Sequence, residues 1–465
     1  MINSKPVIHW FRRDLRITDN TALAAAAQSA SAVIPVYILS NWKNTHGWTG
    51  SPRQEFLCGG LKSLAQNIGR SGGRLVIRQG AAVTELERLV VESGAHAIFF
   101  NRDPDPFGRA METRVKKMAA GLGIAVHDFK DATIHERNEI LTTTGQPYRV
   151  FTPYSRAWLK TGSPSPLPAI NRLATPPEIS SLPLPELDAW NLQGTALIPE
   201  PGEKAAHKRL ADFLAGPIFE YAAARDFPAS AATSLLSADL RFGTLSIREI
   251  FRKCLEASEN TTISQRKNVF TFVNELIWRE FYMQILWHWP EVLDHEFNPK
   301  WRGLKWREPG AAFERWRDGQ TGFPIVDAAM RQLNATGFMH NRLRMIAAMF
   351  LTKDLHIDWR HGERHFMQRL VDGDIAANNG GWQWSAGTGA DAAPYFRIQN
   401  PWSQTRRYDP EGAFIRQWVP ELREVAPARL MTPPTDGRPL AKNYPTPMLD
   451  HAREREVALK MYSEA

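Results

Sequence analysis

The sequence predicts an α/β doubly wound parallel sheet followed by an all-α region. Three observations support this prediction. Short apolar runs alternate with helical segments up to about residue 130. A proline-rich stretch then separates the two halves, and strand signals nearly vanish after residue 201. We therefore expect an α/β domain over 1–130, an inter-domain connection over 131–200 and an all-α domain over 201–465.

The strands of the first domain are predicted from apolar runs bounded by charged residues or glycine. They cover 6–11, 32–39, 73–80, 96–101 and 124–129. Between them lie helical patterns over 21–30, 53–69, 81–94 and 111–123. Alternation of this length is typical of a parallel sheet, which binds ligands beyond the carboxyl ends of its strands. No GxGxxG follows the first strand, so the dinucleotide-binding fingerprint is absent.

The connection is identified by proline in "SPSPLP" and "SLPLPELDAW", which is typical of extended chain. Beyond it, apolar residues recur at helical spacing. The predicted helices cover 202–216, 246–259, 265–289, 322–337, 339–357 and 362–376. The stretch "DGDIAANNGGWQWSAGTGADAAPYFRIQNP", 372–401, is too rich in glycine for a single helix and too apolar for a surface linker.

Composition narrows the function classes. Of the 465 residues 43% are hydrophobic and 23% charged, and only two are cysteines, Cys58 and Cys254. This argues against a disulfide framework and a cysteine zinc site, and no signal peptide or transmembrane run is recognisable. We expect an intracellular protein without a structural metal. The net charge of +8 is by itself a weak pointer to nucleic acid, and most of the 16 tryptophans are expected in the core.

Two helices place polar groups on a non-core face. In "VNELIWREFYMQ", helical spacing puts Glu275, Trp278 and Tyr282 on one side, a carboxylate beside large aromatic rings. In "MHNRLRMIAAMF", Asn341 and Met345 lie opposite the apolar stripe. Together these faces suit a planar polar ligand, although each alone is also compatible with ordinary packing.

The sequence patterns that could indicate a metal site or a phosphate-binding site are weaker. His361 and His365 have i, i+4 spacing, but no HExxH motif or third ligand accompanies them, so they are interpreted with His356 as solvated helix residues. The segment "TSLLSADLRFGTLS", which begins at Thr233, places hydroxyls and backbone N–H groups before a helix. It predicts either a phosphate cradle or an ordinary N-cap.

Long motifs resemble the photolyase/cryptochrome family, nearest to its class I cyclobutane pyrimidine dimer photolyases. They are "WFRRDLRITDN", "YRVFTPYSRAWL", "NELIWREFY", "GFPIVDAAMRQLNATGFMHNRLRM" and the stretch 372–401. The resemblance implies an antenna domain followed by a helical domain that binds FAD, active when fully reduced. It assigns the flavin to Tyr221, Thr233, Ser234, Leu235, Leu236, Ser237, Phe272, Arg344, Asp372, Gly373, Asp374 and Asn378, with Asn378 at the flavin N5.

The resemblance also implies a light-driven repair reaction on DNA. Trp382, Trp359 and Trp306 would relay electrons during photoreduction of FAD. Glu275 would stabilise the dimer anion, and Asn378 with these tryptophans would complete the catalytic set. The flipped dimer and its DNA backbone would contact Arg225, Glu275, Trp278, Asn341, Arg342, Met345, Trp384, Arg397 and Gln404.

Some positions qualify the resemblance. Relatives that repair (6-4) photoproducts place paired histidines where Asn341 and Met345 stand, which favours cyclobutane dimers here. Phe272 and Phe338 replace tryptophans of close relatives. Around Asp103 and Arg109 the sequence lacks the Asn-Glu pair of folate-binding members. An antenna chromophore could be a deazaflavin, a folate or a flavin, or could be absent.

Two other functions are compatible with part of the sequence. A blue-light signalling cryptochrome would share FAD and the tryptophans, but "HAREREVALKMYSEA" is no long signalling tail. A nicotinamide-dependent flavoprotein lacks its dinucleotide motif. The expected protein is a monomeric deoxyribodipyrimidine photo-lyase acting on UV-damaged DNA, not on membranes. It would be cytoplasmic, and associated with the nucleoid when bound to DNA.

Overall fold

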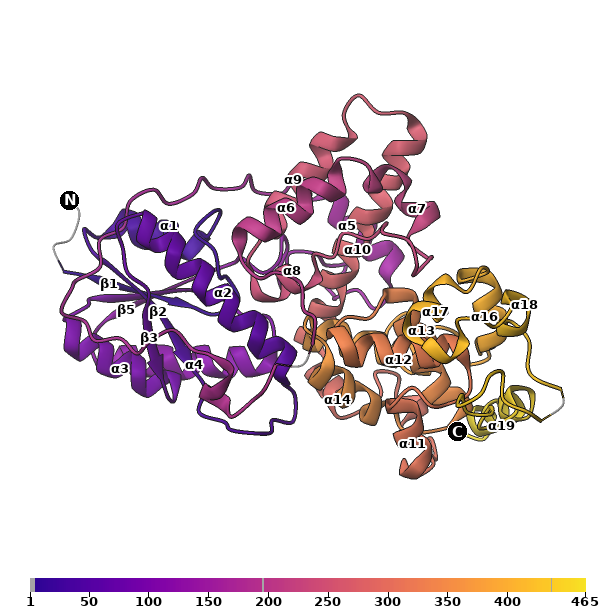
Figure 1. Cartoon of the computed structure of the whole chain (residues 1–465). Helices are drawn as coiled ribbons and strands as arrows, with labels where there is room; N and C mark the ends of the chain where they lie inside the picture. The colour runs from indigo at the N-terminus through magenta and orange to yellow at the C-terminus, as the bar shows by residue number, and fades with distance from the viewer. Residues whose placement is uncertain (1–4, 195, 436) are drawn as a thin grey trace.

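The computed structural model describes residues 5–194, 196–435 and 437–465, which form an α/β part and a helical part (Figure 1). The sheet consists of β1 (Val7–Phe11), β2 (Val33–Leu39), β3 (Val76–Gln79), β4 (Ala97–Asn101) and β5 (Ala125–Phe129). Its order is β3-β2-β1-β4-β5, and every pairing is parallel. The predicted doubly wound sheet is confirmed.

Helices cover both faces of the sheet. They are α1 (Thr21–Ser29), α2 (Ser51–Arg70), α3 (Ala82–Ser93) and α4 (Pro106–Gly121). Alternate residues of β1 point to opposite sides. Val7 and Phe11 join the core under α1 and α2, whereas Ile8 and Trp10 join the core under α3 and α4. Every residue of β1 is buried, as expected for a central parallel strand.

The segment between the two parts is packed rather than free. It contains α5 (Phe151–Lys160) and the 3-10 turn η1 (Leu187–Trp190). Tyr154 and Trp158 of α5 are buried in the core of the helical part. Trp190 is fully buried against the α/β part, and Val33 donates its backbone N–H to the Ala174 carbonyl at 2.8 Å. The proline-rich composition therefore marks extended chain laid over the α/β part (Figure 1).

The helical part is built around the 26-residue helix α10 (Ile263–His288), which begins with a capping box of Thr262 and Gln265. The other α-helices are α6 (Glu203–Leu214), α7 (Tyr221–Ala224), α8 (Ser237–Phe242), α9 (Ile247–Ser258), α11 (Gly310–Arg317), α12 (Pro324–Thr336), α13 (Asn341–Met349), α14 (Trp359–Arg369), α15 (Ile375–Ala386), α16 (Pro401–Tyr408), α17 (Ala413–Trp418), α18 (Pro427–Leu430) and α19 (His451–Ser463).

Three details differ from the predicted helices. The helix expected over 362–376 ends at Arg369, and the chain is irregular until Asp374 caps α15. The helix expected over 339–357 ends as α13 at Met349 and continues as a π-helical turn, η5 (Phe350–Asp354). The glycine-rich stretch starts with a regular helix, α15. Each glycine inside this helix lies either where a neighbouring side chain leaves no room for a Cβ atom or where the surrounding space is open.

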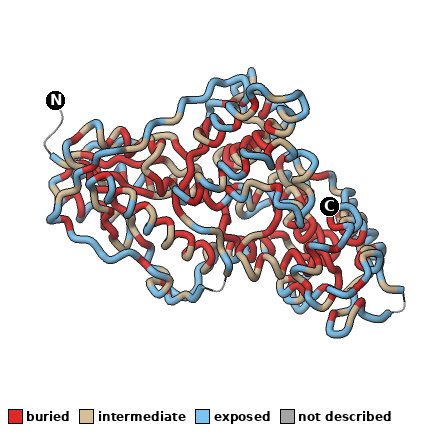
Figure 2. The backbone as a smooth tube through the Cα atoms, turned by 45° about the horizontal axis from the view of Figure 1, so that its top comes forward, coloured by how far each residue is buried: buried red, intermediate tan, exposed pale blue. Residues whose placement is uncertain are grey.

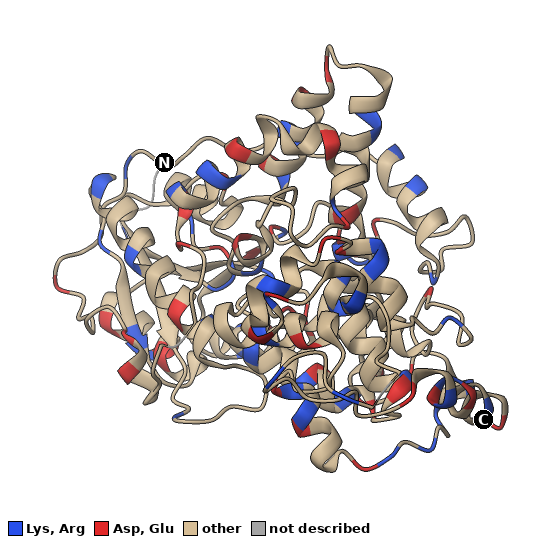
Figure 3. Cartoon of the chain, turned by 45° about the vertical axis from the view of Figure 1, so that its right-hand side comes forward, with Lys and Arg blue, Asp and Glu red and all other residues tan. Residues whose placement is uncertain are grey.

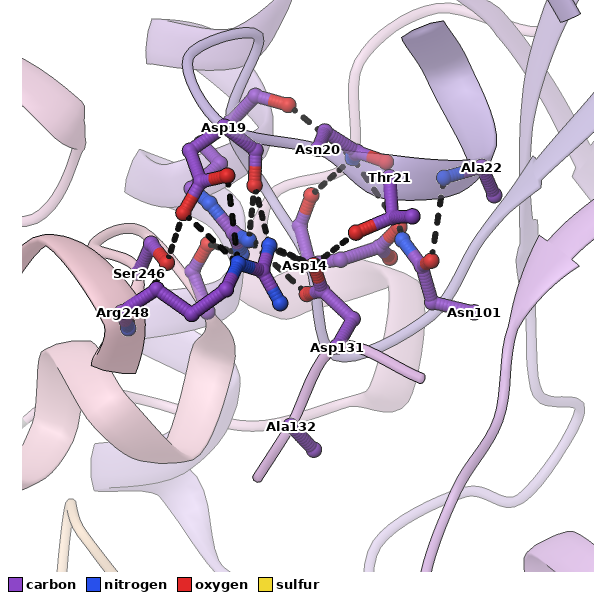
Figure 4. Close-up of polar contacts among 12 residues, drawn as sticks. Asp14, Asp19, Asn20, Thr21, Ala22, Asn101, Asp131, Ala132, Ser246 and Arg248 are labelled. Carbon is purple, nitrogen blue, oxygen red and sulfur yellow. Dashed lines mark hydrogen bonds and ion pairs between the residues drawn. The ribbon is translucent and has the colours of Figure 1, made fainter. Parts of the chain in front are cut away.

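A buried ionic network joins the two parts (Figure 4). Arg248 of α9 bonds Asp19 through Nε at 3.0 Å and Asp131 through Nη2 at 2.8 Å. Arg16 reaches the same Asp131 carboxylate at 2.8 and 2.9 Å. Buried charges must be paired with opposite charges and hydrogen-bonded, because burial without a partner is costly. This network therefore fixes how the helical part sits on the α/β part.

Buried segments concentrate inside both parts and at their contact, while exposed positions lie mostly in loops and outer helix faces (Figure 2). Lys, Arg, Asp and Glu are interspersed over the molecule (Figure 3). Across residues 5–194, 196–435 and 437–465, no helix combines the length and apolar character that crossing a membrane requires.

Candidate cofactor and substrate site

A cavity of about 490 Å³ opens in the helical part between α10, α13, α15 and the segment before α8. This volume lies within the usual range for ligand sites. Most predicted site residues line it: Tyr221, Arg225, Thr233, Ser234, Leu235, Leu236, Ser237, Phe272, Glu275, Trp278, Asn341, Arg344, Met345, Asp372, Gly373, Asp374, Asn378, Trp382 and Trp384. Arg342, Trp359, Trp306, Arg397 and Gln404 are not among its lining residues.

One face of α10 forms the aromatic wall of the cavity. Glu275, Trp278 and Tyr282 all line it, as their helical spacing predicts. Trp278 stacks flat on Phe151 of α5, with 3.7 Å between ring centroids and 4° between planes. Its position is thus fixed by an element of the inter-domain segment, and the indole presents a rigid plate to the cavity.

Ion pairs hold the charged residues near this wall. Arg225 pairs with Glu275, and Arg342 pairs with Asp226 at 2.7 Å. The guanidinium of Arg342 also lies 4.7 Å from the ring centroid of Tyr408. Two of the three arginines predicted to hold DNA, Arg225 and Arg342, are therefore already oriented by carboxylates.

The segment before α8 shows a strained backbone. Leu235 has a φ of +54°, the left-handed region that branched and bulky residues rarely adopt, and 45% of its surface is exposed. Ser234 accepts from the Leu236 N–H at 3.4 Å. Strain of this kind is typical of ligand-binding loops, and it favours the cradle interpretation over an ordinary N-cap.

A cluster of buried charges forms the opposite side. Asp374 caps α15, accepting from Ala376 N at 3.1 Å, and pairs with Arg13 of the α/β part. Burial alone would raise its pKa, but the positive charges of Arg13, Arg241 and Arg279 outweigh that effect and hold the pKa well below the ordinary value. The carboxylate therefore stays ionised.

Arg241 and Arg279 line the cavity but were not predicted. Burial lowers the pKa of Arg279 to about 10, and its guanidinium donates to Ala132 O at 2.7 Å. Arg241 donates to Gly373 O at 3.0 Å. Arg279 follows Glu275 by four positions on α10, so helical spacing could have found it. Arg241 has no comparable signal, because tertiary folding brings α8 to the cavity.

Asp372 and Asn378 present polar groups to the cavity. Asp372 binds Arg344 through Oδ2 at 2.8 Å, while its buried Oδ1 has no hydrogen-bond partner. Asn378 donates through Nδ2 to the backbone oxygen of Glu363 at 3.0 Å. An unpaired buried carboxylate oxygen at a cavity wall indicates that a ligand donates there.

The three predicted relay tryptophans lie at different depths. Trp382 is buried at the cavity wall, and Trp359 is fully buried at the first turn of α14 with its Nε1 donating to Glu296 at 3.2 Å. Trp306 is half-buried, and the neighbouring Arg307 forms a bridge with Ile357. Buried Trp316, which was not predicted, contacts Trp382 at 6.1 Å between centroids.

The histidines differ from the prediction. His361 is exposed, but His356 and His365 are buried, so the interpretation of all three as solvated is wrong. Burial lowers the pKa of His365 to about 3, which keeps its imidazole neutral within the packed helices. In the described part of the chain, no three His, Cys, Asp or Glu side chains are grouped so that they could hold a metal ion.

These features fit FAD. The cavity combines an apolar and aromatic surface for the ring system with a hydroxyl-rich strained loop and buried arginines for the phosphates. The unpaired Asp372 Oδ1 and the unpaired buried Nε1 of Trp382 are polar groups without protein partners. Gly381 lines the cavity and leaves open space where a Cβ would stand.

The α/β part, the helical part and this cavity define a flavoprotein whose cofactor site lies among helices rather than at the sheet. Two family models match the chain: DNA photolyase over residues 7–173, and the FAD binding domain of DNA photolyase over 272–464. A deoxyribodipyrimidine photo-lyase of Agrobacterium fabrum is 39% identical, over 99% of this chain and 98% of that protein. The chain belongs to the DNA photolyase family.

Two solved structures are similar throughout. A class III photolyase of Agrobacterium tumefaciens has a TM-score of 0.91 and 38% identity, covering 100% of this chain and 98% of the other. An archaeal photolyase of Sulfolobus tokodaii, described with two FAD molecules, has a TM-score of 0.86 and 30% identity, covering 99% and 100%. Because a class III structure is this similar, placement nearest to class I stays a prediction.

Proposed function

We propose that this chain is a light-driven DNA repair enzyme, a deoxyribodipyrimidine photo-lyase that splits cyclobutane pyrimidine dimers with an electron from reduced FAD. A single observation carries the proposal. Most residues expected to bind the lesion, and all those expected to bind the flavin, line one cavity. Substrate and electron donor would thus be held against each other without a long transfer path.

FAD, when bound, supplies a light-excitable donor that gives one electron to the dimer and receives it back. The chain's own residues bind and orient the partners. The hydroxyls of Thr233, Ser234 and Ser237, with Arg241 and Arg279, suit the phosphates. Arg344 and Asp372 suit the polar edge of the ring system, and Asn378 suits its N5 position.

The lesion side is formed by aromatic and polar side chains. Trp278 and Trp384 offer ring faces, and stacking of a base on such a ring is worth about 1–3 kcal/mol. Asn341 and Met345 offer a neutral edge rather than an acid–base pair. Glu275 would hydrogen-bond the dimer and stabilise the charge that develops on it.

Binding of the damaged DNA requires the dimer to leave the helix. A dimer is poorly stacked, so extruding it costs less than extruding a normal pair. Arg225, Arg342, Arg397 and Gln404 would hold the DNA backbone near the extruded dimer, and Arg397 is exposed. Each phosphate neutralised by an arginine would make the affinity fall with salt, by a slope of roughly −0.9 in the logarithms.

Trp382, Trp359 and Trp306 would serve a separate step, the reduction of resting oxidised flavin by light. Trp382 borders the cavity and Trp306 is half-buried, which supports a series that would lead from the cofactor toward solvent. The α/β domain would hold the antenna chromophore, a deazaflavin, folate or flavin, if the protein has one. The enzyme would act as a monomer that associates with the nucleoid through DNA.

The deciding experiment is a light-dependent repair assay. Reduced protein is incubated with an oligonucleotide that contains one thymine dimer, in blue light and in darkness, and the remaining dimer is quantified. We expect loss of the dimer only in light. Equal dimer in both samples would contradict repair and favour a signalling flavoprotein with the same cofactor.

A further inference from the structure

Arg53 of α2 is a buried cation directly behind the wall of the cavity. It belongs to the α/β part, and only 5% of its surface is exposed. Its Nη1 donates to Gly373 O at 2.8 Å, and its Nη2 donates to Met367 O at 2.7 Å. A Cβ added at Gly373, which lines the cavity, would lie 3.3 Å from the Arg53 Cζ. The guanidinium therefore packs against the backbone of a cavity-lining residue.

The contact around Arg53 is tightly closed. The first turn of α2 meets the end of α14, and a Cβ added at Gly50 would lie 1.9 Å from Gln368 O (Figure 1). Arg53 Nη2 also donates to Thr49 Oγ1 at 3.2 Å, while its buried Nε has no hydrogen-bond partner. A charge in such a place is screened far less than a charge at the surface, so its field extends into the neighbouring cavity.

A second cation approaches the same carbonyl oxygen. Arg241 lines the cavity, and its Nε donates to Gly373 O at 3.0 Å. Two guanidinium groups thus share one neutral acceptor, although their like charges repel each other. Burial and the neighbouring charge of Arg241 lower the pKa of Arg53 to about 9. The protein alone leaves positive charge at this wall poorly compensated.

The carboxylates whose negative charges act on Arg53 are paired with other residues. Asp374 pairs with Arg13, and Asp372 binds Arg344 through Oδ2 at 2.8 Å. Among the residues that the structure describes, Arg53 itself forms no ion pair with a carboxylate. A buried cation without a paired anion costs far more than a neutral donor at the same place.

Hydrogen bonding to the carbonyls does not by itself explain an arginine. Met367 lies in the last turn of α14, where the helix dipole favours a cation with the equivalent of about half a charge. This offsets only part of the positive charge on Arg53. A neutral glutamine could donate to a carbonyl as well. The full charge is explained if an anion occupies the cavity on the other side of Gly373.

We propose that Arg53 is a cofactor-binding residue supplied by the α/β part, whose positive charge acts from behind Gly373 on the negative charge of bound FAD and so strengthens FAD binding. The proposal rests on the placement of FAD in the proposed function and is independent of dimer repair. FAD carries negative charge on its diphosphate in both redox states, and its fully reduced anionic form carries a further charge on the ring.

The test separates charge from hydrogen bonding. Arg53→Gln keeps a donor for the carbonyls and removes the charge, whereas Arg53→Lys keeps the charge and loses the forked geometry. Holoenzyme is dialysed to equilibrium in darkness and without DNA, and bound and free FAD are quantified to give Kd. The pH is 6, low enough for lysine to hold its proton even where burial lowers its pKa. The measurement is made with oxidised protein in air and with reduced protein without oxygen.

Arg416→Gln is the matched control. Arg416 also donates to two backbone carbonyls, Glu411 O at 2.7 Å and Val425 O at 2.9 Å, and its buried Nε likewise has no hydrogen-bond partner. It lies outside the cavity lining. Circular dichroism checks that each variant is folded, and Arg53→Met supplies the neutral side chain if Arg53→Gln does not fold.

We expect the Kd for FAD to rise by about tenfold in Arg53→Gln and to stay within about threefold of the wild type in Arg53→Lys and Arg416→Gln. An equal rise in both redox states would place the diphosphate nearest Arg53, and a larger rise with reduced FAD would place the ring there. An unchanged Kd in Arg53→Gln would overturn the proposal. So would an equal rise in Arg53→Lys and Arg53→Gln, because the forked hydrogen bonds rather than the charge would then hold FAD.

Light-dependent dimer splitting by the wild type is measured separately. Because FAD binding is followed in darkness and without DNA, a failure of the repair function is distinguished from a failure of this role for Arg53.

Discussion

At the scale of single residues, some buried carboxyl groups in and near the site stay charged, whereas burial keeps others neutral. Asp374 is surrounded by three arginines and stays ionised. Glu363 lies among helices without an opposing charge at hydrogen-bond distance, and burial raises the pKa of its carboxyl. The two carboxyl groups therefore differ in charge state, because their local electrostatic surroundings differ.

Replacing Glu275 tests its role toward the dimer. The carboxylate lines the cavity beside Trp278 and pairs with Arg225, so Glu275→Ala removes the group expected to stabilise charge on the lesion. We expect the yield of repair per absorbed photon to fall severalfold while FAD content stays at the wild-type level. Quantitative photolysis at a fixed light dose measures the first, and flavin absorbance the second. Loss of FAD would instead assign Glu275 to the cofactor.

Glu363 makes a prediction about pH. Its pKa rises from 4.5 in the unfolded chain to about 8 in the fold. The folded state thus binds the proton more tightly, so this contribution to stability is complete below pH 4.5 and is lost as the pH rises toward 8. Glu363→Gln cannot titrate. Between pH 5 and 8 the unfolding free energy of the wild type relative to this variant should fall by roughly 3–4 kcal/mol, at about 1.4 kcal/mol per pKa unit.

Denaturant titrations of both proteins at several pH values check this expectation. The difference between the two proteins removes the contributions of all other titrating groups that the substitution leaves unchanged. A constant difference across the range would show that the carboxyl titrates alike in both states.

At the scale of elements, the α/β half was predictable because each strand and helix has a recognisable local pattern in the sequence. Apolar runs bounded by charged residues or glycine predicted all five strands of the sheet. The helices around the cavity were harder. The break at Leu370–Asp374 is set by Arg53, which donates to the Gly373 and Met367 carbonyls from the α/β part. Such distant partners leave no local pattern in the sequence.

The glycines of α15 illustrate the same limit. Gly380 and Gly381 lie inside a regular helix, although the stretch 372–401 was predicted to be too rich in glycine for a single helix. Glycine at these two positions is explained by the tertiary structure around them. A Cβ at Gly380 would lie 2.1 Å from Cδ1 of Tyr282, whereas Gly381 faces open space at the cavity. Gly380 is thus needed for close packing of α15 on α10, a requirement that only the folded structure reveals.

Gly380→Ala should therefore destabilise the protein. The added methyl group forces the Tyr282 ring or α15 to move, and overpacking of this kind costs about 1–3 kcal/mol. Gly69→Ala in α2 is the control, because nothing lies within 4 Å of its Cβ and alanine is favoured over glycine in a helix by about 0.5–1 kcal/mol. Denaturant unfolding measures both. Equal stability of the two variants would mean that α15 accommodates the added methyl group without a loss of unfolding free energy.

At the scale of the whole molecule, buried ion pairs join the two halves. The Arg248, Asp19 and Asp131 network crosses their boundary, and Arg13 of the α/β part reaches Asp374 at the cavity. The cofactor site is thus completed by a residue of the other domain. The family resemblance, more than any local pattern, located this site in advance, since its residues come from segments between 221 and 384.

The series of Trp382, Trp359 and Trp306 that is proposed for photoreduction yields a prediction about the whole enzyme. Trp306 is half-buried and lies outside the cavity lining, so it can take part in photoreduction without contacting the lesion. Phenylalanine keeps most of the packing but is much harder to oxidise than tryptophan. In Trp306→Phe we expect light-driven reduction of oxidised FAD to slow at least tenfold, while repair by chemically reduced enzyme stays within twofold of the wild type.

Flash absorption of the flavin measures the first rate, and dimer loss under reducing conditions the second. Trp418→Phe is the matched control, because Trp418 is also partly buried, its Nε1 has no hydrogen-bond partner, and it packs against Phe414 away from the cavity lining. It should change neither rate. If Trp306→Phe impaired both activities equally, the electron that reduces the flavin and the electron that repairs the dimer would share a route. The separation between the outer tryptophans and the lesion face of the cavity would then carry no functional meaning.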